Sequence, residues 1–472
     1  MKRLLILASL LLLAASPSKL TERQRAQHAL SRLAFGARPG DVDRVLFLGV
    51  DKWIEQQLHP ERLSDAAVDA QLRRYGTLRY SDAQIVAEFY KPLQEMRKAK
   101  KSKEELDADP AMRELRQKAR RVNAELVSQR ILRAADSERQ LNEVLVDFWM
   151  NHFNVYAAKG VDRFLLTSYE RDVIRPHIWG RFEDLVMATA KSPAMLFYLD
   201  NARSRSGAIN ENYARELMEL HTLGVDGGYT QKDVTELARV LTGWTIKRPQ
   251  EGDAGFVYRP FFHDRGAKEV LGQKIAAGGG MEEGERMIRF LARQPATAHH
   301  IALQLCQRLV SDDPPPALVD RVAKRFLATN GDLRETVRAV VTSREFWSPA
   351  AYQTKFKSPF EYAISAVRAM GATVENPLPI ARELQKIGEP LYLAQPPTGY
   401  SDRSDAWTNS GALMARLNFA VALASNKLPG VRVENVPELD LDLSPATRKA
   451  IADKDPITTA GLILGSPEFQ RQ

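Results

Sequence analysis

The stretch NENYARELMELHTLGVDGGYTQKDVTELARVLTGWT, residues 210–245, contains two helical patterns separated by a glycine-rich turn. Apolar side chains recur every three or four residues on both sides of the turn, which is the spacing of a helix that buries one face. Thr230 followed by Asp233 resembles a capping box, with Asp in place of the usual Glu, and indicates where the second helix begins. Gly224 and Gly243 mark the ends of the two helices. The stretch therefore predicts two helices joined by a short turn.

The same helical spacing runs through most of the chain, whereas strand signals are scarce and never alternate with helices. This pattern excludes doubly wound and barrel folds and predicts an all-α protein, a multi-helix orthogonal bundle. The exception lies near 250–280, where aromatic, alternating residues predict a small irregular or hairpin insert. Further helical patterns cover residues 22–35, 126–153, 283–291, 297–309, 316–329, 333–344, 359–370, 380–387, 411–424 and 444–453.

The first residues have the pattern of a secretory signal. Lys2 and Arg3 precede a short apolar run, residues 4–15, and small residues follow it. The run is too short to cross a bilayer comfortably, and no later segment is apolar enough to do so. We therefore expect a signal peptide at 1–18 and a single domain at 19–472, exported to the periplasm or the exterior and not integral to the membrane after processing. The alternative is an uncleaved N-terminal anchor.

The formal net charge of the 472-residue chain is +8, and much of the excess falls in a basic stretch at about 91–133. We expect this stretch to form a basic helical arm. A basic surface permits an anionic partner, but a run of charge is more often a solvated helix face, and we do not expect nucleic acid to bind. The single cysteine, Cys306, excludes an intrachain disulfide and a Cys-ligated zinc site, and its apolar helical setting indicates a small core residue.

A helix over residues 212–223 separates its side chains into two faces. The polar face carries Asn212, Arg215, Glu216 and Glu219, and the opposite face carries Tyr213, Ala214, Leu217, Met218 and His221. In one interpretation the polar face meets solvent, Arg215 pairs with Glu219, and His221 is a hydrogen-bonded core residue. In the other, the carboxylates line an enclosed cavity as acid and base or as metal ligands. Glu219 and His221 point nearly opposite ways, which argues against one metal between them.

Two further stretches carry candidate chemistry. In DFWMNHFNV, residues 147–155, the aromatic content predicts a mostly buried helix, so His152 and the asparagines either satisfy one another or form a site. In FFHDRGAK, residues 261–268, the pair His263 and Asp264 lies in a predicted loop, where functional residues are common. Signatures of serine hydrolases, zinc proteases and phosphate-binding loops are absent.

Together with residues 210–245, several segments resemble the domain-of-unknown-function family numbered 1800. They are HALSRLAFGARPGD, FWMNHFNV, RDVIRPHIWGRFEDLVMATAKSPAMLFYLDN, HDRGAKEVLG and LGSPEFQ. The resemblance implies a predominantly helical, often exported bacterial protein, often encoded beside a sulfatase-like exported protein, and it brings no accepted reaction. The matching motif positions are Asn151, His152, Arg175, His177, Asn210, Glu211, Asn212, Arg215, Glu216, Glu219, His221, Arg239, Trp244, His263 and Asp264.

Because polar residues predominate among these positions, the leading hypothesis is a hydrolase of an envelope or extracellular polymer, which is anionic or a glycan. Glu216 and Glu219 would be acid and base in a cavity shared with Asn212, Arg215 and His152. In a variant of this hypothesis a divalent metal is held by residues drawn from His152, His221, His263 and Asp264. The alternatives are a non-catalytic assembly or export partner of the sulfatase-like protein and an anion-binding surface protein.

Overall fold

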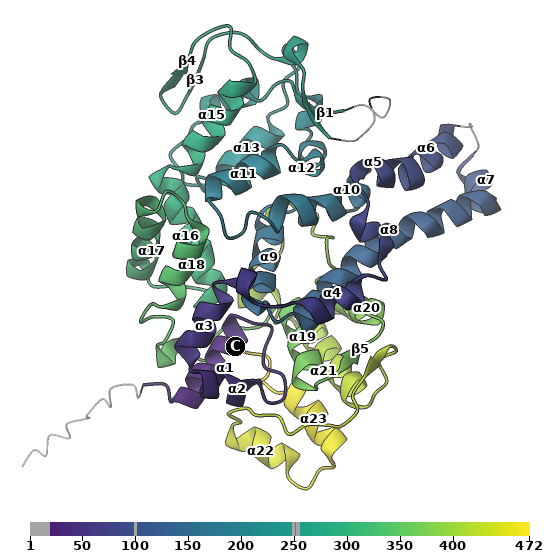
Figure 1. Ribbon diagram of the computed structural model, residues 1–472, viewed down its shortest axis with the longest axis vertical. Helices are drawn as coiled ribbons and strands as arrows, with labels where there is room; N and C mark the ends of the chain where they lie inside the picture. Colours follow the sequence, from purple (N-terminus) through teal and green to yellow (C-terminus); the bar gives the residue numbers. More distant parts are fainter. Residues whose placement is uncertain (1–18, 99–101, 248–250, 252–254) are drawn as a thin grey trace, which may run out of the picture.

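The computed structural model describes residues 19–98, 102–247, 251 and 255–472, and these residues are mostly helical with small antiparallel strand pairs (Figure 1). The prediction of an all-α protein is confirmed. No helix in the described ranges combines the length and the apolar character that crossing a bilayer requires. The signal peptide predicted at 1–18 lies outside the described residues.

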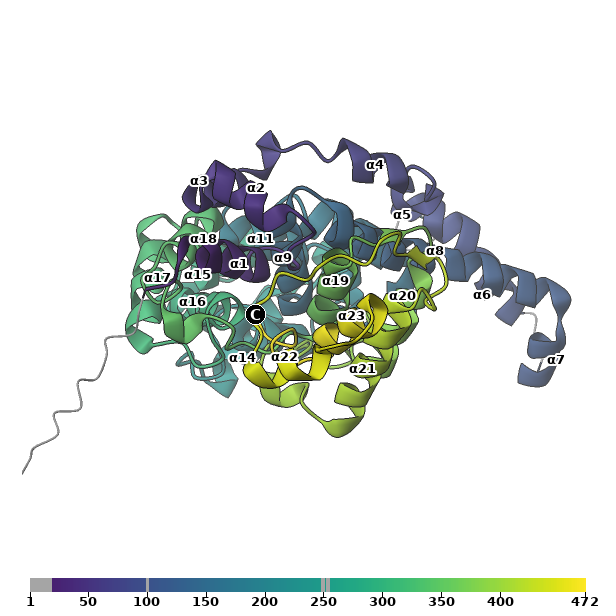
Figure 2. The same ribbon diagram turned by 90° about the horizontal axis from the view of Figure 1, so that it is seen from below.

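The N-terminal part folds into short helices followed by one long helix. The elements are α1 (Glu22–Arg32), α2 (Asp41–Leu48), α3 (Val50–Gln57), α4 (Ala66–Leu72), α5 (Asp82–Ile85), α6 (Lys91–Lys98), α7 (Lys103–Ala108) and α8 (Pro110–Asp136). The helices α6 and α7 and the outer half of α8 stand out from the body in both views (Figures 1 and 2). These helices carry the outer part of the basic stretch at about 91–133, whereas residues 125–132 of α8 are buried.

The middle of the chain places α9 (Gln140–His152) in the centre of the molecule (Figure 1). It is followed by α10 (Asp162–Ser168), α11 (Phe182–Ala190), α12 (Pro193–Tyr198), α13 (Asn212–Glu219) and α14 (Gln231–Val240). The insert has two strand pairs rather than one hairpin: β1 (Trp244–Ile246) with β2 (Phe256–Tyr258), and β3 (Lys268–Val270) with β4 (Gln273–Ile275).

The C-terminal half returns to helices, and its last segments lie close to α1. The elements are α15 (Met281–Ala292), α16 (Pro295–Leu309), α17 (Pro316–Ala328), α18 (Leu333–Val341), α19 (Pro359–Ala369), α20 (Leu378–Ile387), α21 (Ser410–Ala424), α22 (Pro445–Ile451) and α23 (Pro456–Leu464), with the pair β5 (Thr373–Val374) and β6 (Val431–Arg432). Single turns lie at Pro60–Arg62, Gly76–Arg79, Val86–Tyr90, Tyr169–Ile174, Asn201–Arg203, Pro260–Phe262, Pro349–Ala351 and Ser404–Ala406.

One predicted helix is divided. The apolar spacing over 126–153 indicates a continuous helix, but the chain breaks between α8 and α9 at Ser137. The Ser137 hydroxyl donates to Asp65 (2.8 Å) and accepts from the Arg139 backbone N–H (2.9 Å), while Asp65 also accepts from the Glu138 N–H (2.9 Å). The backbone groups freed at the break are therefore satisfied by a residue distant in the sequence, which no local pattern reveals.

Candidate functional site

The polar face of α13 lies at a half-buried position, and its opposite face is buried as the helical spacing predicts. Glu216, Glu219, Arg215 and Asn212 are partly exposed, whereas Tyr213, Ala214, Leu217 and Met218 are buried. Arg215 does not pair with Glu219 as the solvent-face interpretation assumed. It donates instead to Glu211 (3.2 Å) and to Gln231 of α14 (2.8 Å), which leaves Glu219 free of that ion pair.

The two carboxylates of α13 influence each other. Burial raises the pKa of Glu216, the negative charge of Glu219 raises it further, and Arg215 opposes the shift. Burial and then the charge of Glu216 raise the pKa of Tyr198 at the end of α12. Glu219 likewise adds to the effect of burial that raises the pKa of Tyr229. Such a setting favours the neutral form of the Glu216 carboxyl beside a second carboxyl group, an arrangement typical of acid–base sites.

His152 has hydrogen-bond partners other than these carboxylates. Its ring is buried, with Nδ1 at 2.7 Å from Gln304 Oε1 and Nε2 at 3.3 Å from the backbone oxygen of His221. The imidazoles of His221 and His300 lie 5.9 and 6.3 Å away, centre to centre. Burial and these two neighbours lower the pKa of His152, and burial lowers that of His221 to about 3. The rings of His152 and His221 are thus buried and that of His300 is partly exposed, and the hydrogen bonds of the His152 ring are with Gln304 and the His221 backbone. A role for His152 beside Glu216 stays a prediction.

His221 itself lies beyond the end of α13, because that helix ends at Glu219 rather than at Leu223. Its backbone N–H donates to the backbone carbonyl of Glu216 (3.0 Å), and the Gly224 N–H donates to the backbone carbonyl of Met218 (3.2 Å). Gly224 has a positive φ of 85°. A left-handed glycine is the usual way to close a helix. The sequence predicts that the helix ends near Gly224, but it does not predict that the last turn is already unwound before that glycine.

The residues of the insert also have internal partners. His263 lies with Nδ1 at 2.9 Å from the Thr242 carbonyl and Nε2 at 3.3 Å from Glu283, which in turn accepts from Lys268 (2.8 Å). Asp264 instead forms a two-pronged ion pair with Arg239 (2.9 and 3.1 Å). The two side chains therefore diverge and fasten the insert to α14 and α15. Over the described residues, no three His, Cys, Asp or Glu side chains are arranged to hold a metal.

Asn151 at the end of α9 and Asn154 just after it fasten a proline-rich loop. Asn151 donates to the Tyr400 carbonyl (2.8 Å) and accepts from its N–H (2.7 Å). Asn154 donates to the carbonyls of Ala394 and Pro396, both at 2.9 Å. These side chains thus supply hydrogen-bond partners to backbone groups of an irregular loop, which is a structural role.

We expect Gly399→Ala to lower the free energy of unfolding by about 1–3 kcal/mol more than Gly272→Ala does. A Cβ on Gly399 would meet the Asn151 backbone oxygen at 2.5 Å, whereas one on Gly272 would meet open space. Both residues have a similar positive φ, 70° and 75°, so the backbone strain is matched and the difference reports the close contact. Urea unfolding of the two variants measures it, and equal losses would contradict the close approach of loop and helix.

A small polar cavity of about 40 Å³ lies under this loop. Arg130 and Arg308 donate to the two oxygens of Asp147 (2.5 and 2.9 Å), and Arg308 also donates to Asp402 (3.0 Å). Burial raises the pKa of Glu389, which lines the same cavity, to about 8. The volume suits a water molecule or two but no substrate. No sequence motif pointed to Arg130, Arg308 or Glu389, although Arg130 and Arg308 lie inside apolar helical patterns, where a charge is a usable signal.

A larger, basic groove of about 720 Å³ lies between α6, α8, α10 and α20. Its described lining residues include aliphatic side chains and no Asp or Glu. The guanidinium groups along it are those of Arg97, Arg116, Arg120, Arg163 and Arg382. Partial burial and the charge of Arg97 lower the pKa of Arg163, and the Asn123 side-chain oxygen is buried without a partner. Arg116 is paired with Asp107 (2.5 Å), whereas the positive charge along the rest of the groove has no carboxylate among the described lining residues, which favours an anionic ligand.

The groove and the α13 carboxylates are flanked by the same segment. Ala157, Ala158 and Arg163 line the groove, and Lys159 between them bonds to the Tyr198 carbonyl and to Asp200 (2.9 Å). Tyr198 in turn lies within electrostatic reach of Glu216. The protein is therefore a helical one with an acidic pair on α13 and a separate basic groove.

The family model described as "Protein of unknown function (DUF1800)" matches residues 28–471. The chain therefore belongs to this family, as the sequence motifs indicated. No curated protein and no solved structure matches the chain.

Proposed function

We propose that this protein is an exported hydrolase that cleaves an anionic envelope or extracellular polymer, with Glu216 as general acid and Glu219 as base. The observation that carries the proposal is the half-buried Glu216, whose pKa is raised by burial and by Glu219 on the same helix face. In the proposed step Glu219 takes a proton from water, the water oxygen attacks the scissile carbon, and Glu216 gives its proton to the departing oxygen.

The basic groove supports an anionic substrate. Arginine side chains bind carboxylate, sulfate and phosphate groups in the same forked geometry, and five of them line this groove. A polymer held there would pass the segment 157–163, which adjoins Tyr198. The predicted signal peptide supports a location in the periplasm or outside the cell, where such polymers occur. Asn212 and Arg215 flank the carboxylates as positioning residues.

The test compares Glu216→Gln with Glu211→Gln in the purified mature protein. We expect wild type to release new reducing ends from one of a panel of polyuronates, sulfated glycans and peptidoglycan. Glu216→Gln should lower this rate at least about 100-fold, because a general acid contributes about 10²–10⁴-fold. Glu211 lies one position before α13 and is bound to Arg215, Gln231 and Thr235, so Glu211→Gln should keep the rate.

Thermal unfolding of the same variants separates catalysis from folding. Since the fold penalises the charged form of Glu216, the neutral glutamine should leave the unfolding temperature at neutral pH unchanged or higher. Activity should decline as pH rises and Glu216 loses its proton. Glu216→Gln protein that melts earlier, together with wild type inactive on the whole panel, would overturn the proposal.

That outcome would favour the second candidate, a non-catalytic partner of a sulfatase-like exported protein. The observation behind it is that many family motif residues, among them Asn151, Asp264 and Arg239, have internal structural contacts. A signature built from such contacts preserves a fold without requiring a substrate.

A further inference from the structure

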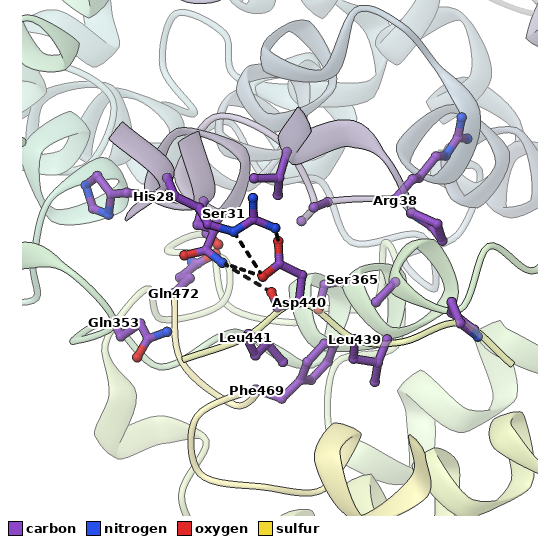
Figure 3. Close-up of a pocket in the computed structure, with 18 of the residues that line it drawn as sticks. His28, Ser31, Arg38, Gln353, Ser365, Leu439, Asp440, Leu441, Phe469 and Gln472 are labelled. Atoms are coloured by element: carbon purple, nitrogen blue, oxygen red, sulfur yellow. Dashed lines mark hydrogen bonds and ion pairs between the residues drawn. The ribbon is translucent and has the colours of Figure 1, made fainter. Parts of the chain in front are cut away.

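A second cavity, of about 330 Å³, lies between α1 and the C-terminal segments (Figure 3). None of its lining residues belongs to the groove or to α13. Its volume falls in the range of small-molecule sites, about 300–1,000 Å³. Figure 3 shows Leu439, Leu441 and Phe469 on one side and His28 and Ser31 of α1 on the other.

The wall formed by residues 437–442 is held by its acidic side chains. Asp440 accepts from Arg23 (3.4 Å) and Gln27 (3.3 Å), and Asp442 accepts from Gln24 (3.2 Å). Leu439 and Leu441 line the cavity together with Asp440, whose carboxylate binds α1. The cavity is closed by contacts between the two ends of the described chain.

Lys357 lies in the wall of this cavity with 5% of its surface exposed. Its Nζ donates to the Ser365 hydroxyl (3.1 Å) and lies 4.0 Å from the centre of the Phe469 ring. Both of these partners line the same cavity, so the amine is at the cavity surface and not behind it.

The other buried lysines among the described residues form ion pairs, whereas the amine of Lys357 is bonded to a hydroxyl. Lys355 donates to Asp312 (2.9 Å) and Lys268 to Glu283 (2.8 Å). The carboxylate of Glu361 on α19 acts on Lys357 only at a distance, because it is bound to Arg308 (3.1 Å) and Gln472 (3.0 Å). Burial and the charge of Arg416 on α21 oppose that carboxylate and lower the pKa of Lys357 to about 7.

We propose that Lys357 is a carbonyl-capture site that forms an imine with a small aliphatic aldehyde bound in the cavity. The amine nitrogen adds to the carbonyl carbon, the carbonyl oxygen leaves as water with the two amine protons, and a C=N bond remains. A lysine without its proton has the lone pair that this addition requires. The leucines and Phe469 suit an aliphatic body, and the Ser365 hydroxyl lies beside the reacting nitrogen.

The test uses the full chain with hexanal and sodium cyanoborohydride at pH 7, followed by digestion and mass spectrometry of each lysine. We expect Lys357 to be alkylated at least ten-fold faster than Lys52, an exposed lysine, because exposed amines are almost fully protonated at this pH. Lys355 and Lys268 should stay unlabelled, being buried and ion-paired. Labelling of Lys357 no faster than that of Lys52 would overturn the proposal.

A cavity-filling variant controls for the route of the aldehyde. Leu439→Trp should protect Lys357 at least ten-fold while the labelling of Lys52 stays the same, since the larger side chain occupies the cavity without touching the surface lysine. Unchanged labelling of Lys357 in Leu439→Trp would show that the aldehyde does not bind there and would also overturn the proposal. Lys357→Met should remove the labelled peptide.

Discussion

Arg308→Met is expected to lower the free energy of unfolding by about 3–5 kcal/mol, the cost of breaking a buried ion pair on one side. The guanidinium of Arg308 is 5% exposed and lies 2.9 Å from Asp147, 3.1 Å from Glu361 and 3.0 Å from Asp402. Methionine fills much of the same volume but leaves these carboxylates with less positive charge. The charges join α9, α16 and α19 to the loop before α21, so the loss should affect the whole fold.

The matched control is Arg344→Met, the same substitution at an ion pair on the surface. Arg344 is 83% exposed beside Glu345, and exposed pairs contribute about 0–1 kcal/mol. Urea unfolding of both variants at pH 7 measures the difference. A double variant with Asp147→Leu should lose less than the sum of the single losses, because the two residues interact. Equal, small losses in Arg308→Met and Arg344→Met would show that the central charges carry little of the stability.

Asp162→Asn is expected to become more stabilising as pH rises. Asp162, the first residue of α10, has no exposed surface, and both of its carboxylate oxygens lack a hydrogen-bond partner. Burial is the largest effect and raises its pKa to about 9, with Lys159 opposing the shift and Asp200 adding to it. An ordinary aspartate has a pKa of about 3.9, so the unfolded chain releases this proton far more easily than the folded one.

The sign of the effect follows from that difference. Between the two pKa values, each unit of rising pH lowers the free energy of unfolding of the wild type by about 1.4 kcal/mol, because only the unfolded chain releases the proton of Asp162. The Asp162→Asn variant has no such proton to release and does not lose this stability. The difference in unfolding free energy between Asp162→Asn and wild type should therefore grow by about 4 kcal/mol from pH 5 to pH 8. Asp172→Asn is the control, because Asp172 is exposed and paired with Arg171, and its difference should stay constant. A pH-independent difference for Asp162→Asn would mean that Asp162 is ionised in the fold.

Both predictions concern buried charged residues outside the candidate site, and polar residues of the family signature are likewise found inside the fold. Polar motif positions suggested one shared cavity, but the structure distributes them over separate networks. Asn151 and Asn154 bind the loop, Arg239 and Asp264 bind the insert, and His152 lies in the core. The α13 carboxylates remain as the polar motif residues with the electrostatics of an acid–base pair.

The sequence by itself determined the helical class, the family and the two faces of α13. These features depend on side-chain spacing within one segment, and the spacing of a helix is local. Only the tertiary structure decided that α8 and α9 separate at Ser137, because the partner that permits the break, Asp65, is distant in the sequence. It likewise decided that Lys357 lacks a carboxylate while Lys355, two residues earlier, has one. Whether a buried charge is compensated depends on which segments meet around it, and packing between distant segments is what a local pattern does not encode.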